Sequence, residues 1–202
     1  LIAFPCFMGL TILGRPILML LYPGQDYVTG GTLLMTGSFA VVLYAVSNIS
    51  GAVLQGIDKM RLPVIHSAIA LAIHIIVVLL LLLLTPMGVY ALVAGNIVFP
   101  LVTSLLNMLA IYRYIRYRQE IRRTFLVPLI ASVVMGVISG GFYFGIYHFW
   151  SHNMILIVAS VGIAVAVYFV MYLKLGGATK EEIYEFPMGV RIVKLAMKLK
   201  LM

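Results

Sequence analysis

Long apolar stretches alternate with short polar connections along the whole chain. Each stretch is close to the roughly 20 residues that a helix needs to cross a bilayer. They are Phe4–Tyr22, Gly31–Gln55, Val64–Leu84, Met87–Tyr112, Phe125–Phe149 and Met154–Leu173. The pattern predicts an all-α membrane protein with six transmembrane helices.

Turn-forming residues mark the connections between these helices. Pro23, Pro63 and Pro86 each follow or precede an apolar stretch, where a proline cannot continue the hydrogen-bonded helix. The connections at 85–86 and 150–153 are very short, so we expect the helices on either side of each to be antiparallel neighbours.

Basic residues are confined to alternate connections. Of the 14 Lys and Arg, all but Arg15 fall in the second connection, in the fourth connection or after the sixth stretch. Cytoplasmic loops of membrane proteins carry this excess of Lys and Arg. We therefore expect a multi-pass protein of the bacterial cytoplasmic (inner) membrane with both ends in the cytoplasm.

The composition supports this class. Hydrophobic residues make up 63% of the chain and charged residues 10%, whereas a soluble domain is about half apolar and about a quarter charged. The net charge of +8 does not indicate nucleic-acid binding, because the bases flank the spans and face anionic headgroups. Membrane lipids are thus an expected partner. Cys6, the single cysteine, cannot form an internal disulfide.

Arg15 is the strongest candidate for a functional polar residue inside a span, because a charge at membrane depth is costly. Its side chain could extend to the outer headgroups. Alternatively, its guanidinium could face a wet cavity and bind a phosphate through two hydrogen bonds.

The inner half of the second helix is unusually polar. Asn48, Gly51 and Gln55 follow one another at helical spacing and could line a substrate cavity. Hydrogen bonding between helices would explain them equally well. In the fourth helix, we expect Asn96 and Asn107 to form packing contacts with other helices. Asn96 is also a candidate for lining the substrate cavity.

Small residues in the last two helices predict close helix packing. The residues are Gly136, Gly140, Gly141, Gly145 and Gly162. His66 and His74 share a helix face but lack a third ligand, so no metal site is expected. The chain contains no catalytic motif or phosphate-binding glycine loop. We therefore expect neither enzyme activity nor a cofactor.

After the sixth helix the composition changes. Gly176 and Gly177 end the last span, and apolar and basic residues alternate over Val190–Leu201. This pattern predicts a basic amphipathic helix on the cytoplasmic membrane surface.

Several stretches together resemble a known family. The first helix has Gly9-Leu10, Pro16-Ile17 and Leu20-Leu21-Tyr22, and the loop after the second reads Leu54-Gln55-Gly56-Ile57-Asp58-Lys59 with Pro63 following. Gly88-Val89-Tyr90-Ala91 and Phe186-Pro187 complete the pattern. The chain is similar to the polysaccharide flippase branch of the multidrug/oligosaccharidyl-lipid/polysaccharide exporter superfamily. It looks closest to the stage V sporulation protein B-like proteins, relatives of the lipid II flippases. It departs from the family at Asp58, where glycine is usual, and at Arg15, where a small or apolar residue is usual.

The resemblance implies a two-lobe transporter of fourteen helices, of which these would be the last six. Residues 1–124 would hold four helices of the C-terminal lobe, 125–175 an additional helix pair, and 176–202 the basic tail. The missing N-terminal lobe of the same chain would be a partner. Asp58, Lys59 and Arg61 would form a cytoplasmic loop.

The implied function is translocation of a polyprenyl-diphosphate-linked oligosaccharide or peptidoglycan precursor across the cytoplasmic membrane. A multidrug or cation exporter of the same superfamily and a non-transporting membrane scaffold are the alternatives. The lipid-linked sugar would be the substrate.

Overall fold

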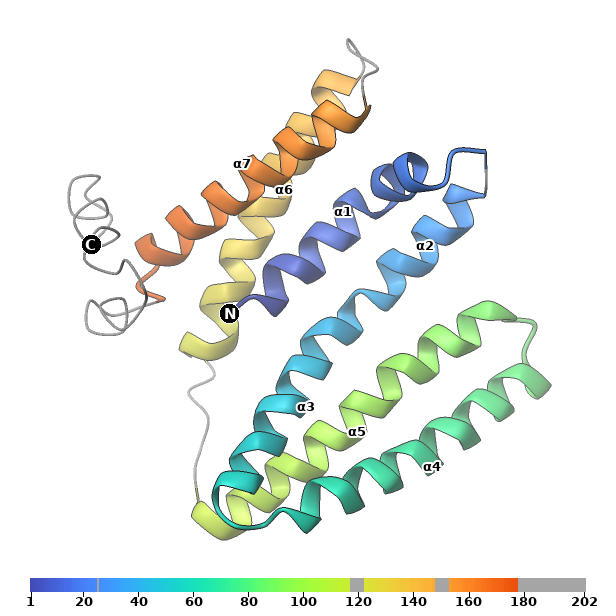
Figure 1. Cartoon of the computed structure of the whole chain (residues 1–202), viewed down its shortest axis with the longest axis vertical. Helices are drawn as coiled ribbons and strands as arrows, with labels where there is room; N and C mark the ends of the chain where they lie inside the picture. Colours follow the sequence, from blue (N-terminus) through green and yellow to red (C-terminus); the bar gives the residue numbers. More distant parts are fainter. Residues whose placement is uncertain (25, 117–121, 148–152, 178–202) are drawn as a thin grey trace. The chain divides into compact units, whose positions relative to one another are not determined.

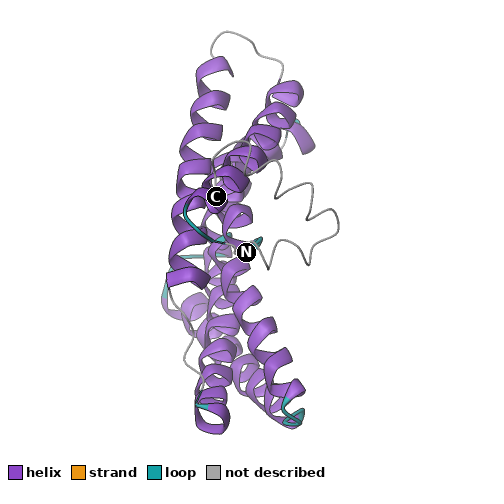
Figure 2. Ribbon diagram, turned by 90° about the vertical axis from the view of Figure 1, so that its left-hand side faces the viewer, coloured by secondary structure: helices purple, strands orange, loops and turns teal. Residues whose placement is uncertain are grey.

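The computed structural model describes residues 1–24, 26–116, 122–147 and 153–177. All regular structure in these ranges is helical (Figure 2). In chain order the elements are α1 (Ala3–Leu21), α2 (Tyr27–Gly37), α3 (Phe39–Gly56), α4 (Arg61–Leu84), α5 (Val89–Ile115), the π-helical turn η1 (Arg122–Leu126), α6 (Val127–Tyr147) and α7 (Asn153–Lys174).

In the described ranges, six helical segments are long and apolar enough to cross a membrane, counting α2 with α3 and η1 with α6 as one segment each. For the described residues, the predicted all-α class and the six helices of membrane-spanning length and apolarity are therefore confirmed. The make-up is that of a multi-pass membrane protein. The predicted basic amphipathic helix over Val190–Leu201 lies outside the described residues.

The second span is interrupted, which the apolar pattern did not predict. Gly37 ends α2, and Ser38 separates it from α3. The Ser38 hydroxyl donates to the Met35 carbonyl at 2.6 Å, and the Thr36 hydroxyl donates to Thr32 at 2.9 Å and Leu33 at 3.1 Å. Hydroxyls bonded back to the helix beside a glycine are a known cause of a helix kink.

Three spans begin three or four residues earlier than predicted, including the fifth, which begins at Arg122 rather than Phe125. The second begins at Tyr27 rather than Gly31, because the Asp26 side chain caps it by accepting from the Thr29 amide at 3.0 Å. The third span, α4, begins at Arg61 rather than Val64 and includes Pro63. A proline is compatible with a first helical turn, since the amide groups there have no carbonyl partner within the helix.

The helices form two compact units. Unit 1 comprises Leu1–Pro23 and Gln119–Met202, and unit 2 comprises Gly24–Arg118. In unit 2, α4 and α5 form the antiparallel pair that their short connection predicted (Figure 1). In unit 1, α6 and α7 pack on each other and on α1. This grouping differs from the expected boundary at residue 124, since α1 belongs with α6 and α7.

Two glycines allow α1 to approach α6 closely. A Cβ at Gly136 would lie 2.5 Å from Ile12 Cδ1, and one at Gly140 would lie 2.7 Å from Ile12 Cγ2. Ile12 thus fills the space that the missing side chains leave. The Tyr168 hydroxyl of α7 donates to the Leu1 carbonyl at 2.8 Å, which fixes the start of α1.

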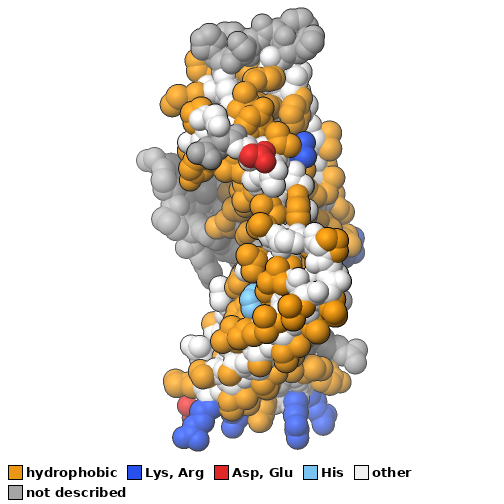
Figure 3. All heavy atoms as spheres, turned by 90° about the vertical axis from the view of Figure 1, so that its right-hand side faces the viewer, with side chains coloured by type: hydrophobic (Ala, Val, Ile, Leu, Met, Phe, Trp, Pro, Cys, Tyr) orange, Lys and Arg blue, Asp and Glu red, His pale blue; other side chains and the backbone are white. Residues whose placement is uncertain are grey.

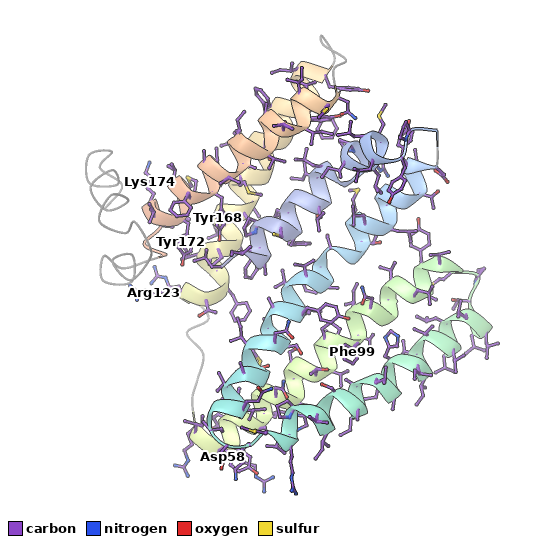
Figure 4. The ribbon with its side chains drawn as sticks, viewed as in Figure 1. Asp58, Phe99, Arg123, Tyr168, Tyr172 and Lys174 are labelled. Atoms are coloured by element: carbon purple, nitrogen blue, oxygen red, sulfur yellow. The ribbon has the colours of Figure 1, made fainter. Side chains whose placement is uncertain are left out.

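The contact between α6 and α7 is made mainly by other residues. Ala131 and Met135 of α6 pack in one buried cluster with Ala164 and Tyr168 of α7. Tyr168 and Tyr172 stack with their ring centroids 5.8 Å apart along α7 (Figure 4). As predicted, α7 ends at the glycine pair: Gly176 has φ +69°, and the Gly177 amide donates to the Tyr172 carbonyl at 2.9 Å.

Candidate functional site

A line of polar side chains runs along the exposed face of α3. Tyr44, Asn48 and Gln55 follow at intervals of four and seven residues, so they share one helix face. Asn48 and Gln55 are exposed. The Tyr44 hydroxyl donates to Oδ1 of the exposed Asn96 on α5 at 2.9 Å, which adds Asn96 to the line. We call Tyr44, Asn48, Gln55 and Asn96 the polar stripe.

The polar stripe reaches well into the depth of the span. Asn48 lies about 12 Å along the axis from the helix end at Gly56, and Tyr44 to Gln55 covers about 16 Å. The hydrocarbon core of a bilayer is about 30 Å thick. Amide side chains at this depth are costly in lipid unless they have polar partners or water.

Gly51 does not share the exposure of the stripe. It is buried, and a Cβ there would lie 3.7 Å from Asn107 Nδ2 and 3.9 Å from Pro63 Cβ. The helical twist turns Gly51 about 60° away from Asn48. The expected face of Asn48, Gly51 and Gln55 is therefore divided between an exposed surface and a closed helix contact.

Asn107 is the centre of that closed contact. Its side chain on α5 is 1% exposed, and its Nδ2 donates to the Ser47 carbonyl at 3.4 Å and to Ser50 Oγ at 3.3 Å, both on α3. With Nδ2 donating, Oδ1 is the acceptor for His66 Nδ1 of α4 at 2.7 Å. We call Asn107, His66, Ser47 and Ser50 the polar node. It joins three helices, as the packing role predicted for Asn107 requires.

His74, about two turns further along α4, has a separate partner. Its Nδ1 lies 2.8 Å from the carbonyl oxygen of Gly95 on α5, so Nδ1 must carry the hydrogen. A Cβ at Gly95 would overlap Val78 Cγ2 and lie 2.9 Å from His74 Cε1. The Phe99 ring contacts His74 edge-on, with centroids 6.4 Å apart (Figure 4). His66 and His74 thus form two different contacts between α4 and α5. The described residues contain no group of three His, Cys, Asp or Glu side chains that could hold a metal ion.

Arg15 lies on the exposed side of α1, in unit 1, whereas the stripe and the node belong to unit 2. The residue after it, Pro16, is buried, and its carbonyl accepts from Asn153 Nδ2 of α7 at 3.3 Å. Asn153 Oδ1 in turn accepts from the Tyr143 hydroxyl of α6 at 2.5 Å. These bonds fix the backbone that carries Arg15. Sequence analysis did not identify Asn153 or Tyr143, because the Asn153–Pro16 contact joins helices far apart in the chain and the Tyr143–Asn153 bond depends on how α6 packs on α7.

The predicted packing glycines fall into two groups. Gly136 and Gly140 are buried against Ile12 of α1. Gly141, Gly145 and Gly162 are exposed, and a Cβ at any of them would meet nothing within 4 Å. The structure therefore places two of these five residues at a helix contact, and that contact is with α1 rather than α7.

The predicted cytoplasmic loop forms a Schellman turn at the end of α3. The Lys59 amide donates to the Leu54 carbonyl at 2.9 Å and the Asp58 amide to the Gln55 carbonyl at 3.1 Å. Asp58 has φ +62°, the left-handed conformation that this motif usually gives to glycine. Arg61 follows as the first residue of α4.

No protein-family model, curated protein or solved structure matches this chain. A functional assignment therefore depends on the residues described above.

Proposed function

We propose that this chain is part of a membrane flippase or exporter that moves a polyprenyl-diphosphate-linked oligosaccharide or peptidoglycan precursor across the bacterial cytoplasmic membrane. The observation that carries the proposal is the polar stripe. Asn48, Gln55 and Asn96 are exposed on helices long enough to span a bilayer. Side chains of this kind are retained at membrane depth where they face a wet cavity or another part of the protein.

The polar node supports the same interpretation by contrast. The Asn107 amide is hydrogen-bonded to His66, Ser47 and Ser50 inside the helix contact, so its presence is explained by helix packing alone. Asn48 and Gln55 lie on the exposed side of α3, one of the helices that Asn107 joins, and have no part in those hydrogen bonds. Transporters built from repeated lobes place their substrate sites between lobes near the midplane. A second lobe of the full-length protein, preceding residue 1, would complete such a cavity.

A phosphate-bearing substrate fits the charge distribution of the spans. None of the six spans contains Asp or Glu, whereas α1 carries the exposed Arg15. An arginine can hold a diphosphate through paired hydrogen bonds. A cation exporter would need an acidic group for its cargo, which this part of the chain does not supply. Translocation from the inner to the outer leaflet would leave the polyprenyl tail in lipid.

The decisive experiment measures water access to the stripe in the full-length protein. In a Cys6→Ser background, Asn48→Cys and Gln55→Cys are exposed to a water-soluble, charged thiol reagent. Ile76→Cys and Leu79→Cys on α4 are the controls, since both positions are exposed apolar sites. We expect labelling of the two stripe positions and none of the controls. Protection of both stripe positions would favour the scaffold alternative and reject the proposal.

Substrate class is tested separately by reconstituting the full-length protein with a fluorescent polyprenyl-diphosphate sugar in vesicles. Transport with the wild-type sequence, and its loss in Arg15→Ala with partial recovery in Arg15→Lys, is the expected result. Absence of transport would reject the substrate. Full activity of Arg15→Ala would leave Arg15 only the role of reaching the outer headgroups.

A further inference from the structure

Every Lys and Arg of the described part of unit 2 lies at one end of that unit. Lys59 and Arg61 belong to the α3–α4 connection and the start of α4, and Arg113 and Arg116 lie at the end of α5. These side chains gather at the lower edge of the surface in Figure 3. We call Lys59, Arg61, Arg113 and Arg116 the basic end. Asp58 is the one carboxylate of the described residues beside them (Figure 4).

The backbone holds one of these cations in a defined place. The Schellman turn at Asp58 directs the chain from α3 into α4, and Lys59 Nζ lies 5.1 Å from the ring centroid of Tyr114 on α5. A lysine over a tyrosine face is attracted by the ring quadrupole. The contact therefore joins the loop to the end of α5 and brings the two pairs of cations to one surface.

Exposed apolar side chains lie among the cations. Met60 is 63% exposed, Tyr112 and Tyr114 are each 52% exposed, and Ile115 is 46% exposed. A soluble polyanion would bind through the cations alone and would make no use of the exposed Met60 and Ile115 side chains. Alternating cations and apolar side chains match the boundary between acyl chains and phosphates, where tyrosine is also enriched. This combination identifies the occupant as a lipid.

We propose that the basic end is a binding site for the phosphate of an anionic phospholipid headgroup, with Lys59 held in place by Tyr114. The excess of cations over carboxylate selects a net negative headgroup over a zwitterionic one, since each nearby Lys or Arg strengthens such binding about fivefold. The inference does not depend on the proposed transport function. It concerns a surface separate from the polar stripe.

The test uses the full chain, purified in a neutral detergent, with native mass spectrometry to measure binding of phosphatidylglycerol and phosphatidylcholine of identical acyl chains. We expect phosphatidylglycerol to bind roughly tenfold more tightly or better, with a preference that falls as salt rises. The joint substitution of Lys59, Arg61, Arg113 and Arg116 by Gln should abolish the preference. Equal binding of the two lipids to the wild-type protein would overturn the proposal.

A second pair of variants separates a built site from net charge alone. Tyr114→Leu keeps every charge but removes the ring under Lys59, and should weaken phosphatidylglycerol binding about threefold. Tyr114→Phe keeps the ring and should bind as the wild type does. If Tyr114→Leu binds normally while Arg122→Gln/Arg123→Gln in unit 1 loses as much preference as the basic-end variant, charge alone accounts for binding and the proposal fails. Displacement of the lipid by soluble glycerol phosphate would likewise reject a lipid site.

Discussion

His66 Nδ1 of α4 lies 2.7 Å from Oδ1 of Asn107 on α5, and this bond closes a hydrogen-bond chain that continues to α3. The Asn107 side chain is almost wholly buried, so neither end of its amide can turn to water. In a membrane protein, where lipid offers little hydrophobic drive between helices, polar contacts of this kind add to packing in fixing which faces meet. The polar node thus sets the register of α3, α4 and α5.

Replacing Asn107 with Leu should lower stability by about 1–3 kcal/mol, because Ser50 and His66 lose a buried partner. The measurement is the unfolding midpoint in detergent. Asn48→Leu is the matched control and should be neutral, since Asn48 is exposed. A double-mutant cycle with His66→Ala should give a non-additive result. Strict additivity would mean that the two side chains do not interact.

Gly95→Ala should destabilise unit 2 by about 1–3 kcal/mol, because the new methyl would overlap Val78 and displace His74. Val78→Ala in the same chain should recover much of the loss by making room. Gly141→Ala is the control: its Cβ meets nothing, so it should be neutral or slightly stabilising. The measurement is the thermal unfolding midpoint of the wild type, Gly95→Ala, Gly95→Ala with Val78→Ala, and Gly141→Ala. A Gly95→Ala protein as stable as the Gly141→Ala protein would contradict the observed close approach of α4 and α5.

Asp58→Gly should raise stability by up to about 1 kcal/mol, because the left-handed backbone at this position favours glycine. Asp58→Val should lower it by at least as much. Asp58→Asn separates the charge from the backbone effect and should stay close to the wild type. At the end of α7, Gly176→Ala should be destabilising in the same assay, because Gly176 also has a left-handed backbone, with φ +69°. Stability unchanged by Asp58→Gly would show that the loop does not hold this conformation.

Asp26, which caps the start of α2, contributes to the stability of the folded protein in a way that depends on pH in the acid range. The hydrogen bonds from Thr29 to its carboxylate hold the pKa of Asp26 below the usual 3.8. This stabilisation is complete above pH 3.8 and is lost as the pH falls through the lower folded-state value. Asp26→Asn keeps an oxygen acceptor for the cap without titrating, so its unfolding midpoint should vary less with pH below about 4. Identical acid profiles for the two proteins would exclude this contribution.

The sequence predicted the spans because their signal is local. A run of apolar residues long enough to cross a bilayer needs no knowledge of the rest of the chain, and the α4–α5 pairing followed from the short connection alone. The interruption at Ser38 escaped prediction because Gly37 and Ser38 lie within an unbroken apolar stretch. Kinks depend on individual hydroxyl contacts that a hydropathy pattern does not contain.

Side-chain partners were predictable only where the residue type restricts the choice. Asn107 and His74 had to find hydrogen bonds in the membrane, and both do so across helices. The glycines were less informative, because their spacing predicts a helix face made of small residues but does not predict which helix packs against it. Gly136 and Gly140 receive Ile12, a residue more than a hundred positions earlier in the chain. Periodicity carries no signal for such a contact.

That contact has a consequence for biosynthesis. The helix α1 is translated before α2 to α5, yet its companions α6 and α7 emerge from the ribosome only afterwards. The small-residue surface of α6 does not exist while the intervening helices are being synthesised, so α1 can form this contact only after α6 has been made. Assembly of unit 1 is therefore a late event in the production of this protein, and unit 2 can be completed first.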